Sequence, residues 1–345
     1  MIPNPDAIPV GHYWFEILLF VTFLIHLILM NFILGGSLIA TGRILANKEI
    51  AKPSLSIPTL IALTINFGVP PLLFVQVLYG HLFYTSSIMM AIPWILVIPV
   101  LIMAYYGAYL YVYRINKIKK WLGKTGLLVS TVLLMVIAFL YVNNISLMQM
   151  PEKWNAYFEH TNGTYIDFRE PTLFPRYLHF VVGAIAVAGL GSAAFYFYSK
   201  RSPADEKKEG IEKGLRIFSI ATIIQIVVGI LFLITLPKDI MLLFMGDNWF
   251  YTAVLLIGVL LALAVLHSGF KGNFKPTFTL LIALLFFMVL TRHLLRKAYL
   301  NDIFSTDQLT LESQAWPFVA FIFVLLLGVV TIVYMLRLVV KSINS

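Results

Sequence analysis

Nine long apolar stretches constrain this chain more than any other feature of its sequence. A helix needs about 20 consecutive apolar residues to cross a hydrocarbon core of about 30 Å, and its backbone polar groups must pair within the helix. Such stretches occupy residues 14–40, 57–79, 89–113, 125–147, 175–198, 215–236, 249–268, 276–297 and 316–338. The sequence therefore predicts an all-α, polytopic transmembrane helix bundle with about nine spans, in a single membrane domain over residues 1–345.

The placement of charged residues predicts the orientation of the chain. Hydrophobic residues make up 60% of the sequence and charged residues 12%, whereas soluble domains average about 45–50% and 25%. Most of the basic residues lie in alternate loops, where 18 of the 25 are Arg43, Lys48, Lys52, Arg114, Lys117, Lys119, Lys120, Lys124, Lys200, Arg201, Lys207, Lys208, Lys213, Arg216, Lys271, Lys275, Arg337 and Lys341. By the positive-inside rule these loops are cytoplasmic, which predicts a multi-pass inner (cytoplasmic) membrane protein with its N-terminus outside and its C-terminus in the cytoplasm. The net charge of +9 thus reflects topology and does not indicate nucleic acid as a partner; the partner of the spans is membrane lipid.

Two loops have distinctive compositions. The inner segment SPADEKKEGIEKG at 202–214 is strongly charged and is expected to be a solvated linker. The outer segment at 148–175 mixes aromatic and acidic residues, which is typical of an interfacial aromatic belt and equally of a docking surface. The first span is expected to be a retained helix, because no basic segment precedes it.

The absence of cysteine excludes several kinds of redox chemistry. With no cysteine in the chain, disulfides, thiolate-bound iron–sulfur clusters and covalently attached heme are impossible. No Walker motif, HExxH motif or nucleophile elbow is present, so ATP use and hydrolysis have no support. A cofactor would have to be bound by histidine, methionine, carboxylate or backbone groups.

Three histidines are candidate ligands of heme iron. His26 lies about 13 residues into the first span, near the middle of the bilayer at 1.5 Å per residue. Ionisable groups at that depth usually serve a cofactor, an ion path or a hydrogen bond between helices. His179 and His293 are the other two, whereas His12, His160 and His267 fall in loops or at a span end.

Arginines accompany two of these histidines. Arg176 precedes His179 by three residues and Arg296 follows His293 by three, so each arginine lies on the same helix face one turn nearer the outer surface. Heme b suits such a pair, because the imidazole binds iron while the guanidinium binds a propionate. Arg292 would add a further cation. Alternatively, the arginines simply snorkel to the interface.

Four segments resemble subunit I of cytochrome bd quinol oxidase. They are HLILMNFILGGSLIA at 26–40, INFGVPPLLFVQVLYG at 65–80, SLMQMPEKW at 146–154 and RYLHFVVGAIAVAG at 176–189. The resemblance covers residues 1–200 best, and residues 201–345 are divergent. It implies a bundle of nine spans, with His179 as the ligand of the low-spin heme b and His26 as the ligand near the oxygen-reducing heme.

The chain departs from this family at the positions that serve oxygen chemistry. Val97 and Tyr105 replace the two glutamates of the family's third helix, and Phe286 stands at the expected heme-binding carboxylate. The long outer loop of the quinol site is reduced to PKDIMLLFMGDN, and residues 249–267 contain no methionine to pair with His179. The expected replacement is His293, Met241 or Met245.

These features predict a heme b membrane electron-transfer subunit without oxidase chemistry. It would carry one or two hemes and pass electrons between membrane quinol and a periplasmic partner, such as a c-type cytochrome, as part of a quinol dehydrogenase. One alternative is an oxygen-reducing bd-type oxidase subunit. Another is a cofactor-free membrane anchor of a redox complex.

Overall fold

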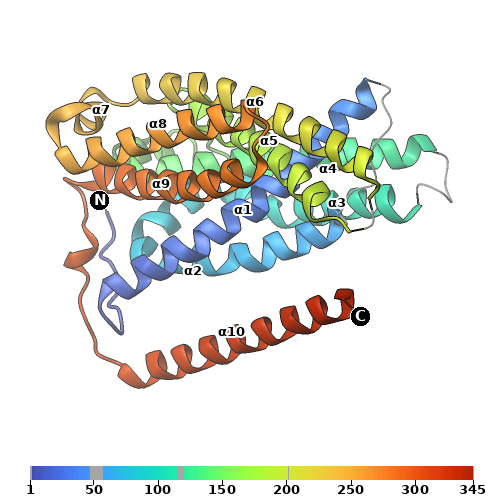
Figure 1. The fold of residues 1–345 in the computed structure, drawn as a ribbon. Coiled ribbons are helices and arrows are strands. Elements are labelled where there is room, and N and C mark those ends of the chain that lie inside the picture. Colours follow the sequence, from blue (N-terminus) through green and yellow to red (C-terminus); the bar gives the residue numbers. More distant parts are fainter. Residues whose placement is uncertain (1, 47–56, 115–119, 201, 345) are drawn as a thin grey trace.

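The chain forms a bundle of long helices that run roughly along one direction (Figure 1). The computed structural model describes residues 2–46, 57–114, 120–200 and 202–344. Its long helices are α1 (His12–Leu45), α2 (Ile57–Met89), α3 (Ala91–Arg114), α4 (Lys120–Gln149), α5 (Leu173–Tyr198), α6 (Ala204–Ile234), α8 (Trp249–Phe270), α9 (Phe274–Leu300) and α10 (Ala315–Asn344). All nine are long and apolar enough to cross a membrane within these described ranges. The predicted all-α polytopic bundle is confirmed.

Short helices make the connections at the end of the bundle that we call the outer end. They are η1 (Pro151–Phe158), α7 (Lys238–Leu242), the π-helical turn η2 (Leu243–Asp247) and η3 (Thr306–Gln308). One prediction about the loops was wrong, because the charged segment at 202–214 is helical from Ala204 and forms the first turns of α6. Its alternating charges favour a solvated helix, as in the ion pair of Lys213 with Glu209 one turn apart.

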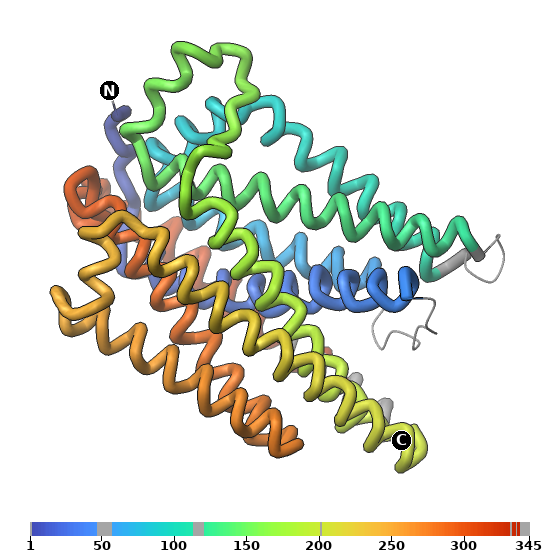
Figure 2. The backbone as a smooth tube through the Cα atoms, turned by 90° about the horizontal axis from the view of Figure 1, so that it is seen from above, coloured from blue at the N-terminus to red at the C-terminus, as the bar shows by residue number. Residues whose placement is uncertain are grey.

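Helix α1 lies inside the bundle and contacts α2, α4, α5 and α9. Figure 2 shows it between α3 and α4 on one side and α8 on the other. A glycine brings α1 close to α5, because a Cβ atom on Gly35 would lie 1.9 Å from the carbonyl oxygen of Ala184. This small residue therefore allows the two helices to pack closely, whereas Gly36 has no neighbour within 4 Å of such an atom.

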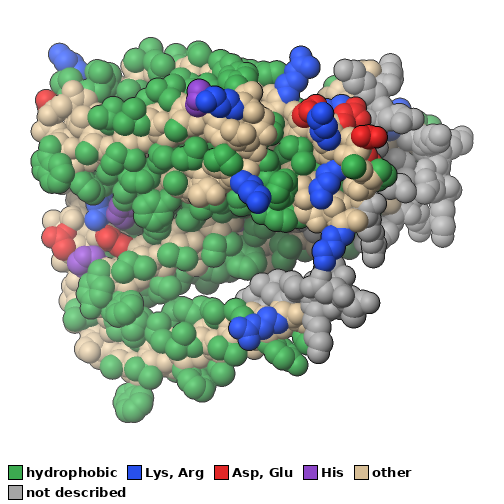
Figure 3. Space-filling model, viewed as in Figure 1, with side chains coloured by type: hydrophobic (Ala, Val, Ile, Leu, Met, Phe, Trp, Pro, Cys, Tyr) green, Lys and Arg blue, Asp and Glu red, His purple; other side chains and the backbone are tan. Residues whose placement is uncertain are grey.

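Helix α10 lies apart from the bundle along most of its length (Figure 1). It is held at its outer end, where the preceding residues pair with the N-terminal segment. The amide of Ile8 donates to the carbonyl of Thr310 at 2.8 Å, and the rings of Trp14 and Phe318 lie 5.4 Å apart. Apolar side chains cover most of the long face of the bundle that is seen in Figure 3, as expected for contact with lipid.

The described connections assigned to opposite sides of the membrane lie at opposite ends of the bundle (Figure 1). The N-terminal segment, η1, α7 and residues 301–314 share the outer end, and the α5–α6 connection lies at the other. Five of the basic residues used for the orientation, Lys48, Lys52, Lys117, Lys119 and Arg201, lie outside the described residues. Which end faces the periplasm stays a prediction.

Single cysteines should report that orientation. Cysteines replacing Asn4 and Asn162, both exposed at the outer end, are expected to react with a membrane-impermeant thiol reagent in whole cells. A cysteine at Asp205, exposed at the other end, should react only after lysis and serves as the control. The chain contains no cysteine of its own, so the reagent can label only the introduced residue. The reverse pattern would invert the assigned topology.

Candidate cofactor site at the outer end of the bundle

His179 faces α6 from the outer half of α5. Its ring lies 6.2 Å from the ring of Phe232, and a Cβ atom on Gly229 would lie 3.2 Å from the His179 Cε1 atom. The backbone carbonyl of His179 accepts a hydrogen bond from Gln225 Nε2 at 2.9 Å, which links α5 to α6. The His179 Nδ1 atom is buried and has no hydrogen-bond partner in the described chain.

Arg176 lies one turn closer to the outer end and is 6% exposed. Its Nη1 donates to Ser146 Oγ at 3.0 Å and to Gln149 Oε1 at 3.1 Å. The guanidinium packs over the rings of Phe232 and Tyr299, at 5.4 and 5.7 Å from their centroids. Its Nε and Nη2 atoms are buried without a hydrogen-bond partner among the described residues. The side chain is therefore positioned for an acceptor that the chain itself does not supply.

Two further arginines join Arg176 in a cluster of positive charge. Arg292 lies within electrostatic reach of both Arg176 and Arg296. Its guanidinium lies 4.2 Å from the ring centroid of Phe23, and that of Arg296 lies 4.9 Å from Tyr79. Lys153, Lys213 and Lys297 form ion pairs within 4.0 Å among the described residues, and their partners are Asp167, Glu170, Glu209 and Glu16. None of the clustered arginines has a carboxylate at that distance.

His293 faces α1 and not α5. With Arg292 and Arg296 it lines a small cavity of about 10 Å³, closed by Leu19, Phe20, Phe23 and Val289. Glu16 of α1 lies within electrostatic reach of His293. This carboxylate accepts hydrogen bonds from Thr306 Oγ1 at 2.5 Å and from Lys297 Nζ at 3.4 Å. The Glu16 charge is therefore already compensated by groups other than the arginines.

His26 lies deeper on α1 and packs against α2. Its Nδ1 is 3.0 Å from the carbonyl oxygen of Thr64, which accepts, so Nδ1 carries the proton. In the neutral ring, Nε2 then keeps its lone pair, as in metal-bound histidines whose other nitrogen donates to a carbonyl. A Cβ atom on Gly68 would lie 2.7 Å from the ring, so only glycine fits there. Arg292 lies within electrostatic reach of His26.

The structure brings the three predicted arginines together but separates the histidines between two faces. The contacts of His179 are with α6, whereas His293 of α9 faces α1 and His26 lies on α1 itself, against α2. The described ring contacts and hydrogen bonds do not join His179 to His293, and a heme shared between these two histidines stays a prediction. Of the alternative ligands, Met245 is 58% exposed.

Three side chains replace the carboxylates that the family resemblance implied, and each packs against neighbouring apolar or aromatic groups. Val97 is buried in an apolar cluster with Met90, Leu140 and Leu147. The Tyr105 hydroxyl lies 3.3 Å from that of Tyr109 on the same helix. Phe286 packs edge-on against Phe20 at 5.0 Å and is 44% exposed.

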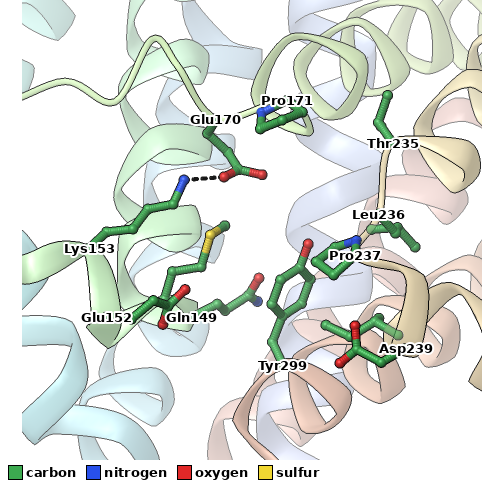
Figure 4. A pocket seen from close by; sticks show the side chains of 12 residues that line it. Gln149, Glu152, Lys153, Glu170, Pro171, Thr235, Leu236, Pro237, Asp239 and Tyr299 are labelled. Atoms are coloured by element: carbon green, nitrogen blue, oxygen red, sulfur yellow. Dashed lines mark hydrogen bonds and ion pairs between the residues drawn. The ribbon is translucent and has the colours of Figure 1, made fainter.

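A cavity of about 420 Å³ opens beside Arg176 at the outer end (Figure 4). It is lined by Gln149, Met150, Glu152, Lys153, Glu170, Pro171, Thr235, Leu236, Pro237, Asp239, Ile240 and Tyr299. Gln149 accepts the hydrogen bond from Arg176, and the buried Tyr299 hydroxyl has no hydrogen-bond partner in the described chain. Sequence analysis selected neither residue, because each comes from a different helix end and no spacing motif connects them.

Ion pairs of Lys153 connect η1 to the segment just before α5. Its Nζ lies 2.7 Å from Asp167 and also pairs with Glu170, which in turn accepts a hydrogen bond from Thr172 Oγ1 at 2.7 Å. Desolvation opposes ionisation of Glu170, but hydrogen bonds from Lys153 and Thr172 outweigh it and lower the Glu170 pKa. Desolvation likewise opposes the charge on Lys153, yet its bonds to Asp167 and Glu170 raise the Lys153 pKa.

Removing Lys153 should destabilise this end of the bundle. In a Lys153→Met variant Asp167 and Glu170 stay mostly buried without their cation, which is expected to cost about 1–3 kcal/mol of unfolding free energy at pH 7. The lowered Glu170 pKa stabilises the fold above about pH 4.3, and this contribution is lost as pH falls through the folded-state pKa. The difference between variant and parent should therefore shrink in acid. Thermal unfolding in detergent at two pH values measures this.

The matched control is Lys213→Met. The ion pair of Lys213 with Glu209 is exposed, with side-chain exposures of 59% and 63%. Losing it should change stability by less than about 0.5 kcal/mol, because exposed pairs are well solvated. Equal destabilisation by both substitutions would show that Lys153 has no special role.

No family model, no curated protein and no solved structure matches this chain. Inference of its function therefore depends on the buried arginines and histidines themselves.

Proposed function

We propose that this chain is a heme b electron-transfer subunit of the inner membrane. It resembles cytochrome bd subunit I but lacks oxidase chemistry, and it passes electrons between membrane quinol and a periplasmic c-type cytochrome. The observation that supports this most strongly is the buried guanidinium of Arg176, whose Nε and Nη2 atoms have no hydrogen-bond partner in the described chain. It lies one turn from His179, whose buried Nδ1 is also without a partner there.

The arginine cluster requires an anion at the outer end of the bundle. A buried charge without a partner costs several kcal/mol, and the buried Arg176 and Arg296 and the half-buried Arg292 also repel one another. Snorkelling does not account for them, because Arg176 is 6% exposed and Arg296 is 4% exposed. Heme b carries two propionates, which would accept charge-assisted hydrogen bonds from Arg176, Arg292 and Arg296.

The histidines would supply the iron ligands. His179 lies closest to Arg176, and His293 and His26 share the face of α1 near Arg292. One heme would be bound by His179, and a second by His293 or His26, with the arginines between them. Heme b supplies a one-electron carrier when it is bound. The protein's part is to hold its propionates and to shield it within the bundle.

Oxygen reduction does not fit the third helix. Protons must reach a buried site through ionisable groups or water, and such groups are retained at membrane depth only for use. Helix α3 contains no carboxylate, and Val97 is closed within an apolar cluster. The enzyme activity that fits is quinol dehydrogenation, with electrons leaving toward the outer face.

A reduced-minus-oxidised absorption spectrum of the purified chain tests this proposal. A b-type band without a d-type band is expected, together with one or two hemes per chain by pyridine hemochrome assay. A d-type band would indicate the bd-type oxidase subunit instead. A folded, monodisperse protein without any heme band would indicate a cofactor-free anchor.

A further inference from the structure

The outer end of the bundle is strongly acidic. Its exposed carboxylates are Asp6, Glu152, Glu159, Asp239, Asp247, Asp302, Asp307 and Glu312, and its exposed cations are Arg169, Lys238 and Lys297. Eight negative and three positive side chains leave a net charge of −5 on this surface, in a chain whose total is +9. Because the basic residues concentrate at the opposite end, the chain is a pronounced electrostatic dipole along the membrane normal.

Two of these carboxylates line the large cavity, and two more lie in segments next to it along the chain. Glu152 and Glu159 lie in or just after η1, and Asp239 and Asp247 lie in α7 and η2. Glu152 and Asp239 line the cavity on opposite sides, as Figure 4 shows. The cations of these segments are Lys238, which is exposed, and Lys153, which lines the cavity and is paired with Asp167 and Glu170. The four carboxylates therefore leave the rim of the cavity negative on balance.

The cavity is also next to the candidate cofactor site, because two of its lining residues contact Arg176. Gln149 and Tyr299 form its inner wall, and both contact Arg176 from the other side, at 3.1 Å for the Gln149 hydrogen bond and 5.7 Å for the Tyr299 ring. A partner that covers the cavity would thus face Gln149 and Tyr299, the two lining residues that contact Arg176.

We infer that this acidic rim is the docking surface for a small soluble electron carrier with a basic, lysine-rich contact patch. The inference rests on the proposed function and specifies where its partner binds. Charges arranged around a binding surface steer an oppositely charged partner and orient it. The rim would hold the carrier over the cavity, where its redox centre comes closest to Arg176 and His179. A metal ion is a poorer occupant, since no group of three or more metal-ligating side chains occurs among the described residues.

Binding should be measured with the full chain in detergent and a zinc-substituted, lysine-rich c-type cytochrome as the probe. This probe is redox-inert, so binding is detected whether or not the chain holds heme. The variant Glu152→Gln/Glu159→Gln/Asp239→Asn/Asp247→Asn is expected to weaken binding by about tenfold or more at low ionic strength. It should also flatten the dependence of affinity on salt, because fewer charges face the probe.

The matched control changes the same number of charges at the other end of the bundle. The variant Asp205→Asn/Glu206→Gln/Glu209→Gln/Glu212→Gln alters exposed carboxylates of α6 and should leave affinity within about twofold of the parent. If both variants weakened binding equally, the loss of affinity would follow from the net charge of the protein and not from the acidic rim, and the inference would be overturned. The absence of salt-dependent binding by the parent would overturn it as well. The heme spectrum is a separate measurement, and its failure would reject the proposed function without bearing on this binding result.

Discussion

The His179→Ala variant is expected to lose its low-spin b-type absorbance while remaining folded. An axial ligand cannot be replaced by a methyl group, and no other described side chain bonds to the buried Nδ1 of this ring. If the chain binds one heme, the whole band should disappear, and if it binds two, about half should remain. Spectra of the purified variant, normalised to protein, measure the loss.

The control for this experiment is His160→Ala. His160 lies exposed in the outer loop and stacks on Tyr165 at 5.5 Å, so its removal should leave the spectrum unchanged. Equal melting temperatures for both variants would show that the fold survives. A folded His179→Ala protein with the full b-type band would reject His179 as a ligand. His293→Ala and His26→Ala, tested in the same way, would show which of these histidines binds a second heme.

The second large effect concerns the electron acceptor. Quinol should drive rapid reduction of a soluble c-type cytochrome by the purified protein, whereas oxygen uptake should stay below about 1 s⁻¹, tenfold under the median enzyme rate of about 10 s⁻¹. Oxygen reduction consumes protons, and α3 contains no carboxylate to deliver them. The Tyr105 and Tyr109 hydroxyls lie 3.3 Å apart, but phenols are weak acids and weak bases near pH 7.

An oxygen electrode and stopped-flow cytochrome reduction measure these two rates with the same preparation. His179→Ala is the internal control, since it should abolish cytochrome reduction without raising oxygen uptake. Cyanide-insensitive oxygen uptake at oxidase-like rates, with no need for a carrier, would support the bd-type oxidase instead.

Local sequence properties were sufficient to predict the fold. Each span is a continuous apolar run, and in lipid such a run has to satisfy its own backbone as a helix whatever its neighbours are. For this reason the nine predicted spans correspond to the nine long helices of the described chain. The prediction of a linker at 202–214 was wrong because this rule applies only inside the bilayer. Charged residues outside it form a helix or a linker with similar ease, and here α6 includes them from Ala204.

The candidate site was only partly predictable. The three-residue separations predicted that Arg176 lies beside His179 and Arg296 beside His293, because residues three apart on a helix share a face. They did not show that Arg176, Arg292 and Arg296 lie within electrostatic reach of one another, since they come from α5 and α9, which are joined by tertiary packing. Nor did they show that Glu16 already has Lys297 and Thr306 as partners.

The sequence by itself determined the helices, their number and the charge difference between the two ends, because hydrophobicity and charge act on each segment independently. Only the tertiary structure decided that Arg176 is buried with two unpaired nitrogens, that His179 faces α6 while His293 faces α1, and that Tyr299 and Gln149 close the outer cavity. These properties depend on which faces of distant helices meet, as where Gly35 lets α1 approach Ala184 of α5. Periodicity specifies a face of a helix but not the partner that covers it.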